Sequence, residues 1–139
     1  MKVIPNFILL CLVTLMVMPF SICLAGMNNK PFKNKLLIFT GSDWCPNCRR
    51  LEKKILDDSV FISFVTDRIT IEFADFPQHK KLENTVVEKN RALAEKYHFQ
   101  GVYPTILLLD SAGNIRSEIF YRNQNAVEII DQLKLLLKQ

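Results

Sequence analysis

Two cysteines separated by two residues are the strongest chemical signal in the chain. Cys45 and Cys48 form a C-x-x-C motif within the segment Trp44-Cys45-Pro46-Asn47-Cys48. Pro46 suits the first turn of a helix, because it lacks an N–H group that would find no partner there. Cys45 is then the N-cap residue and Cys48 lies one turn further on, close enough for a disulfide bond. The motif therefore predicts two thiols that can be oxidised to a disulfide and reduced again.

The predicted cap position gives the two sulfurs different roles. The Cys45 sulfur would face unpaired backbone N–H groups and the positive end of the helix dipole, which both favour thiolate over thiol. Cys45 is therefore the predicted nucleophile, which attacks a substrate disulfide. Cys48 is expected to lie further inside and to be less ionised, and it is the predicted resolving thiol that breaks the mixed disulfide.

A zinc site and a structural disulfide are the alternatives to a redox motif. The chain has no second C-x-x-C pair, and His79 and His98 are not at a spacing typical of metal ligands. A disulfide across so short a loop would constrain the fold very little. We therefore predict no bound metal. We also predict no organic cofactor, because the sequence contains no glycine-rich phosphate loop.

The N-terminal segment has the features of an export signal. Lys2 precedes the apolar run Phe7–Met18, and small residues precede a predicted cut after Ala25. We predict a signal peptide over residues 1–25, with an uncleaved membrane anchor as the alternative, and one domain over residues 26–139. The protein is thus expected in the periplasm, where disulfide chemistry is normal.

Composition and charge exclude several classes of protein. Hydrophobic residues make up 49% of the 139 residues and charged residues 23%, which is typical of one globular domain and not of a disordered chain. The net charge of +4 is mild and the basic residues are scattered, so we predict no nucleic-acid partner. The chain is too short to add a dimerisation domain, and we predict a monomer.

Hydrophobic patterns and turn residues predict the elements that position the motif. In order, we expect a strand over Leu36–Thr40, a helix over Pro46–Leu56, a short helix capped by Asp57-Asp58-Ser59, a strand over Ile69–Asp75, a helix over Asn84–Tyr97 stopped by Gly101, a strand over Thr105–Leu109, a hairpin into a strand over Ile115–Tyr121, and a helix capped by Asn125 and Glu128. That last helix is expected to bury Val127, Ile130, Leu133 and Leu137, and the residues Phe73, Phe76 and Phe99 are expected in the core. This order predicts an α/β fold with a mixed sheet and helices on both faces.

Two separated motifs together resemble the thioredoxin superfamily over essentially the whole mature chain. They are the C-x-x-C segment and Val102-Tyr103-Pro104-Thr105 at the start of a strand. The resemblance implies a thioredoxin fold with a central four-stranded sheet. It also implies a cis peptide bond before Pro104, which would lie against the active-site disulfide. The implied substrate-binding residues are Trp44, Pro46, Asn47, Tyr103 and Pro104.

Within the superfamily, the segments Ser42–Cys45, Leu51–Lys53 and Asp57–Val60 are most similar to the C-terminal periplasmic domain of DsbD and related secreted reductases. The resemblance implies that Glu52 is a candidate proton acceptor for Cys48, and a solvated glutamate paired with neighbouring basic residues is the alternative. Phe39 stands where the family buries an aspartate. Deprotonation of Cys48 would therefore depend on Glu52 or on water.

The function implied by the resemblance is thiol–disulfide exchange. We expect reduction or isomerisation of disulfides in exported proteins, with electrons from a membrane thiol reductant such as a DsbD-type protein. Pro46-Asn47 places no histidine between the cysteines, which favours a reductase over a strong oxidant. A net oxidant, a non-catalytic binding module and a metal carrier remain as alternatives. The surface around Trp44, Tyr103 and Pro104 is expected to bind extended polypeptide by strand addition.

Overall fold

The computed structural model describes residues 34–138. The predicted signal peptide or anchor over residues 1–25 lies outside the described residues. The elements are β1 (Asn34–Thr40), α2 (Pro46–Leu51), the π-helix η2 (Glu52–Leu56), α3 (Ser59–Val65), β2 (Ile69–Asp75), α4 (Asn84–Lys96), β3 (Thr105–Leu109), β4 (Ile115–Ile119) and α5 (Ala126–Leu137). Each of the predicted helices and strands is present, with ends that differ by a few residues.

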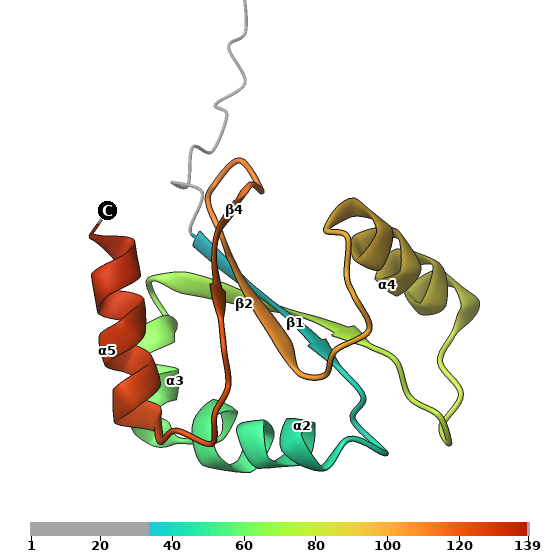
Figure 1. The fold of residues 1–139 in the computed structure, drawn as a ribbon, viewed down its shortest axis with the longest axis horizontal. Coiled ribbons are helices and arrows are strands. Elements are labelled where there is room, and N and C mark those ends of the chain that lie inside the picture. The colour runs from blue at the N-terminus through green and yellow to red at the C-terminus, as the bar shows by residue number, and fades with distance from the viewer. Residues whose placement is uncertain (1–33, 139) are drawn as a thin grey trace, which may run out of the picture. The chain divides into compact units, whose positions relative to one another are not determined.

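The four strands form one mixed sheet in the order β2-β1-β3-β4. β1 runs parallel to β2 and antiparallel to β3, and β3 pairs with β4 as an antiparallel hairpin (Figure 1). In the parallel pair, Thr40 at the end of β1 lies opposite Asp75 at the end of β2. The segments that follow these two strands therefore leave the sheet at the same edge.

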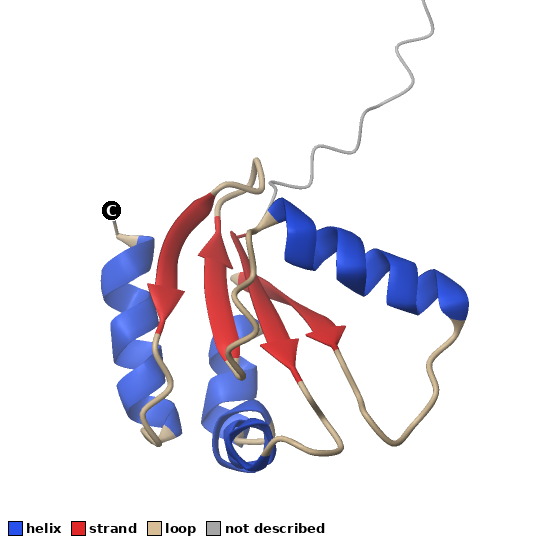
Figure 2. Ribbon diagram, turned by 45° about the vertical axis from the view of Figure 1, so that its right-hand side comes forward, coloured by secondary structure: helices blue, strands red, loops and turns tan. Residues whose placement is uncertain are grey.

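Helices cover both faces of the sheet, as predicted (Figure 2). Side chains alternate between the faces of a strand, and β1 contributes Leu36 and Ile38 to a core shared with α2, η2, α3 and α5. Leu37 and Phe39 point to the other face, where they form a second core with residues of α4 and the segment after it. The C-x-x-C motif lies where β1 leads into the first of these helices.

Side-chain caps fix where two of the helices begin. Asp58 precedes α3, and its Oδ1 accepts hydrogen bonds from the backbone N–H groups of Val60 and Phe61. Asn125 and Glu128 form a capping box at the start of α5, in which each side chain accepts from the other residue's backbone N–H. Both caps were predicted, and both are confirmed.

Two helix predictions were wrong in detail. The helix predicted over Pro46–Leu56 is continuous but changes to a π-helix at Glu52. α4 ends at Lys96 rather than Tyr97, because His98 adopts a left-handed backbone with φ of 50°. His98 therefore ends the helix, before Gly101 is reached.

Two predicted core residues are on the surface. Val127 is 56% exposed, because the face of α5 that packs on the sheet is formed by Ala126, Ile129, Ile130 and Leu133. Phe73 is 48% exposed at the edge strand β2, whereas Phe76 and Phe99 pack against the second core as expected. Within residues 34–138, no helix is both long enough and apolar enough to cross a membrane.

Candidate active site

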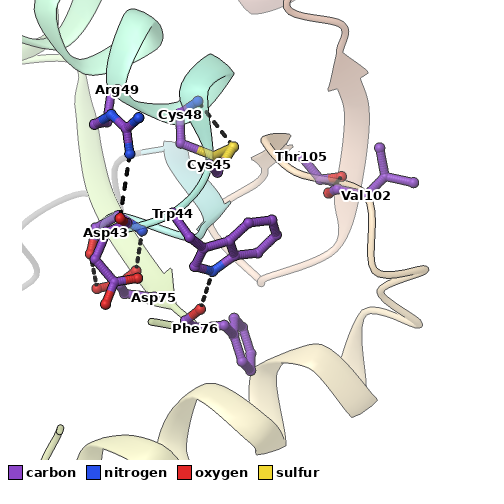
Figure 3. The surroundings of a disulfide bond; sticks show 10 residues. Asp43, Trp44, Cys45, Cys48, Arg49, Asp75, Phe76, Val102 and Thr105 are labelled. Carbon is purple, nitrogen blue, oxygen red and sulfur yellow. Dashed lines mark hydrogen bonds between the residues drawn. A yellow bond between two sulfur atoms is a disulfide. The ribbon is translucent and has the colours of Figure 1, made fainter. Parts of the chain in front are cut away.

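Cys45 and Cys48 are joined by a disulfide bond at the start of α2 (Figure 3). Their Cα atoms are 5.3 Å apart, which is within the normal range for a disulfide. Cys45 is the N-cap residue, as predicted, and its sulfur accepts a hydrogen bond of 3.1 Å from the backbone N–H of Cys48. Both residues are 4% exposed, so the expectation that Cys48 is the deeper of the two was wrong.

The turn that precedes the motif depends on Gly41. The backbone N–H of Cys45 donates to the Gly41 carbonyl at 2.9 Å, which closes the turn between β1 and α2. A Cβ atom added at Gly41 would lie 2.7 Å from Cζ2 of Trp44 and closer still to Cε2 of the same ring. Only glycine therefore lets the indole lie directly against this turn.

Four aromatic rings form one wall of the site. The ring of Tyr103 contacts those of Trp44 and Phe99 edge to face, with centroids 5.1 and 5.0 Å apart. Phe76 is 6.1 Å from both Phe99 and Tyr103. The half-buried Trp44 is fixed further, because its Nε1 donates a hydrogen bond of 2.9 Å to the Phe76 carbonyl (Figure 3).

The second motif lies beside the first. The peptide bond between Tyr103 and Pro104 is cis, as the family resemblance implied. Thr105 Oγ1 donates to the carbonyl of Val102 at 2.8 Å, which closes the loop before β3. Tyr103 and Pro104 also share with Asn47 the lining of a groove of about 520 Å³. Of the other residues implied as substrate-binding, Trp44 contacts Tyr103, and Pro46 is exposed at the first turn of α2.

Asp43 joins the active-site turn to the segment that follows β2, which the sequence analysis missed. Its carboxylate accepts hydrogen bonds of 2.7–2.9 Å from the backbone N–H groups of Gln78, His79 and Lys80. Desolvation acts to raise the pKa of Asp43, but these three backbone bonds together outweigh it and lower the pKa from 3.8 to about 2. The carboxylate is therefore held in its charged form.

Asp75 is the second acidic residue that the sequence analysis missed. Its two carboxylate oxygens accept hydrogen bonds from Ser42, from the backbone N–H at 2.9 Å and from Oγ at 2.7 Å. The sequence offered a signal, since Asp75 is the last residue of the strand predicted over Ile69–Asp75, and this strand pairs in parallel with β1. The carboxyl ends of neighbouring parallel strands meet at one edge, where binding and catalytic residues gather.

Glu52 and Phe39 lie on different sides of the sheet. Glu52 is exposed, and it lines a pocket that also includes Cys48 and Asp75. Phe39 is fully buried on the opposite face and stacks on Phe99, with centroids 4.3 Å apart and an angle of 7° between the rings. In this chain, position 39 therefore belongs to the second core.

The two histidines are on the surface, one in the loop after β2 and one after α4. Across the described part of the chain, no group of three or more His, Cys, Asp or Glu side chains could hold a metal ion. The chemistry that the arrangement supports directly is the oxidation and reduction of the two cysteines.

The family model described as a thioredoxin-like domain matches residues 24–133. The disulfide bond reductase DsbH of Chlamydia pneumoniae is 28% identical over 102 residues, which are 73% of this chain and 61% of DsbH. A solved structure of a DsbH oxidoreductase has a TM-score of 0.72 and 28% identity, and the match covers 77% of this chain and 74% of that one.

The C-terminal domain of Neisseria meningitidis DsbD, in its reduced form, has a TM-score of 0.55 and 18% identity, with 77% of this chain and 84% of that one covered. This likeness shows a common fold. The match to the DsbH sequence of Chlamydia pneumoniae covers 61% of that protein, so this chain spans less than two thirds of its length. With a family match over most of its length, a disulfide-bonded C-x-x-C pair and a cis-proline loop beside it, this chain belongs to the thioredoxin-like domain family.

Proposed function

We propose that the protein is a thiol–disulfide oxidoreductase that reduces or isomerises disulfides of exported proteins. The observation that carries this proposal is the Cys45 sulfur at an N-cap position, bonded to Cys48 and hydrogen-bonded to the Cys48 backbone N–H. In the reduced state, the same N–H can donate to a thiolate on Cys45. Such an arrangement favours the ionised nucleophile that disulfide exchange requires.

The groove beside the disulfide supports a polypeptide substrate. It is lined by Asn47, Tyr103 and Pro104 close to the cysteines, and it extends to Val102 and Phe120, whose side chains are largely exposed. An extended chain that adds as a strand gains main-chain hydrogen bonds, and apolar grooves select some of its side chains. We infer that the substrate is an unfolded or partly folded exported protein.

A reductase or isomerase is favoured over a net oxidant by the relationship to DsbH, which is named a disulfide bond reductase. The reduction potential of the Cys45–Cys48 pair, measured against glutathione, tests this direction. A value close to that of thioredoxin, about −270 mV, agrees with a reductase, whereas a value close to that of DsbA, about −120 mV, would contradict it.

Reduction of insulin by the purified protein tests the activity itself. We expect the wild-type protein to reduce insulin disulfides in the presence of dithiothreitol, and Cys45→Ser to be inactive because it lacks the nucleophile. Asp131→Asn on the exposed face of α5 serves as a control, since it changes a side chain far along the chain from the motif. Equal rates for the wild-type protein and Cys45→Ser would leave a non-catalytic binding module as the better explanation.

We further propose that the protein is exported to the periplasm as a monomer, with a membrane thiol reductant of the DsbD type as electron donor. Cell fractionation of the full chain tests the location, and light scattering tests the monomer. Recovery of the full chain in the cytoplasm, or of a stable dimer, would overturn the respective part of the proposal. Mass spectrometry of the N-terminus distinguishes a cleaved signal from a retained anchor.

A further inference from the structure

Cys48, the predicted resolving cysteine, lines a pocket beside the start of α2. Cys48 is 4% exposed, and it lines a pocket of about 180 Å³ between α2, η2 and the ends of β1 and β2. The polar residues in its lining are Thr40, Ser42, Glu52 and Asp75. Ile38, Leu51, Leu56 and Phe73 make the rest of the lining apolar. The pocket is large enough to hold water molecules bound to the four polar side chains. Cys48 therefore shares this pocket with two carboxyl groups that could exchange a proton with it through water.

The two carboxyl groups of the pocket differ in how firmly they are held. Glu52 is exposed at the start of η2. The side chain of Asp75 is only 17% exposed, and it is bound at both oxygens by Ser42 and at Oδ2 by Lys80, 3.2 Å away. The backbone of Asp75 is fixed as well, because the buried Asn90 donates to its carbonyl at 2.7 Å.

We propose that Asp75 is the residue that exchanges a proton with the Cys48 thiol, through water in this pocket. The proposal rests on the proposed function, because it assigns a step of the same exchange reaction. Position 39, where the family resemblance implies an aspartate, carries Phe39 in this chain. Its side chain stacks on Phe99, on the face of the sheet opposite to the pocket. Asp75 is a positioning residue in this scheme, since it acts on Cys48 through water.

The exchange balances in protons and electrons. The Cys45 thiolate attacks one sulfur of the substrate disulfide, the substrate S–S bond breaks, and the released thiolate takes a proton from solvent. Cys48 then gives its proton through water to the Asp75 carboxylate, and its sulfur attacks that of Cys45. The Cys45–Cys48 bond forms, the Cys45–substrate bond breaks, and the second substrate thiolate takes the proton held by Asp75. The two cysteines lose two electrons and the substrate disulfide gains them.

Charged and titratable groups from several elements face Asp75. Lys80 follows β2, and Arg91 of α4 shares with Asp75 the lining of a second pocket. Glu52 lies across the pocket at the start of η2. Burial raises the pKa of Tyr103, and the negative charge of Asp75 raises it further, which places this phenol in the field of the carboxylate. Any pH dependence must therefore be assigned by comparing variants.

A single-turnover reaction with dithiobis(nitrobenzoate) separates the two chemical steps. Attack by Cys45 releases the first coloured thiolate, and resolution by Cys48 releases the second. For Asp75→Asn we expect the first release to keep its wild-type rate. The second should slow on the order of 10²-fold near neutral pH, a typical contribution of general base catalysis, and recover as the pH rises.

Three further variants make the test specific. Asp75→Glu keeps a carboxylate in the pocket and should restore much of the second rate. Ser42→Ala removes the bond that Ser42 Oγ donates to Asp75 but keeps the carboxylate in the pocket, so the second step should keep most of its wild-type rate. Asp131→Asn, the same acid-to-amide change on exposed α5, should leave both steps unchanged.

Several outcomes would overturn the assignment. One is a parallel slowing of both steps in Asp75→Asn without a change in pH dependence, which is the result expected if Asp75 only holds the turn through Ser42. Another is a slow, pH-shifted second step in Glu52→Gln with a normal one in Asp75→Asn. If Asp75→Asn does not fold, an Asp75→Glu protein with a normal first step but a second step far slower than that of the wild-type protein would also count against the proposal. A wild-type protein that releases neither thiolate would instead refute the proposed function.

Discussion

The indole N–H of Trp44 donates a hydrogen bond of 2.9 Å to the backbone carbonyl of Phe76, which lies 32 residues further along the chain. The neighbouring Asp43 carboxylate binds the three backbone N–H groups that follow Pro77. The turn before the cysteines and the segment after β2 are therefore one connected unit. We expect substitutions in either of these two segments to alter the surroundings of the disulfide.

Gly41→Ala is expected to displace the Trp44 ring. The added Cβ would overlap the indole, and overpacking of this kind typically costs about 1–3 kcal/mol. Loss of the bond to Phe76 should also lower the rate of insulin reduction. Trp44 is the only tryptophan in the sequence, so its fluorescence emission reports the displacement directly.

Gly101→Ala is the matched control for this change. Gly101 has a φ of 76°, and a Cβ there meets nothing within 4 Å. The control should destabilise the protein through backbone strain but leave the Trp44 emission as it is. An unchanged emission spectrum in Gly41→Ala would show that the ring does not lie where the structure has it.

The hydrogen bonds that the Asp43 carboxylate accepts from the backbone of residues 78–80 should weaken in acid. Its pKa is lowered from 3.8 to about 2 in the folded protein. A depressed pKa means that the carboxylate stabilises the fold fully above about pH 4, and that this contribution disappears as the pH falls through 2. Denaturant unfolding of the wild-type protein and of Asp43→Asn, compared at several pH values, measures the contribution.

The difference in stability between these two proteins is the quantity to follow, since other carboxylates with lowered pKa values, such as Glu72 and Asp110, are present in both. We expect the difference to be constant from pH 7 to 5 and to shrink between pH 4 and 2. A difference that does not depend on pH would mean that Asp43 acts through its shape and not through its charge.

The fold was largely predictable from the sequence because its local signals agree with one another. Apolar runs marked the central strands, Asp58 and Asn125 marked helix starts, and Pro46 placed Cys45 at an N-cap. The π-helical turn at Glu52 could not be predicted, since it depends on how the end of that helix packs. The exposure of Phe73 follows from its place on an edge strand, which the sequence does not reveal before the strand order is known.

The two cysteines and the proline loop were predicted from their motifs, but Asp43 and Asp75 were not identified. An aspartate near a turn is common in any sequence, and both roles depend on partners more than 30 positions away. The equal burial of Cys45 and Cys48 likewise depends on tertiary contacts. The positions of Cys45 and Cys48 in the helix were predictable, whereas the side chains that cover the two sulfurs were not.

Introducing an aspartate at position 39 should destabilise the protein rather than restore a proton acceptor. Phe39 is fully buried among Leu37, Leu107 and Phe99, and Phe39→Asp would bury a carboxyl group without partners there. Loss of the large side chain alone costs about 3–5 kcal/mol at such sites. Thermal unfolding should show a much lower midpoint for Phe39→Asp than for Phe39→Leu, the apolar control. Equal midpoints would show that position 39 tolerates a polar group.

Cys48→Ser should trap the protein in covalent complexes with its substrates. Without the resolving thiol, the mixed disulfide between Cys45 and a substrate cysteine can no longer be broken from within the protein. We expect bands of high molecular mass on non-reducing gels of cells that export Cys48→Ser, and these bands should disappear with dithiothreitol. Cys45→Ser should form few or none, because Cys48 is the resolving thiol and not the nucleophile. If Cys45→Ser formed as many complexes as Cys48→Ser, the assignment of the two sulfurs would have to be reversed.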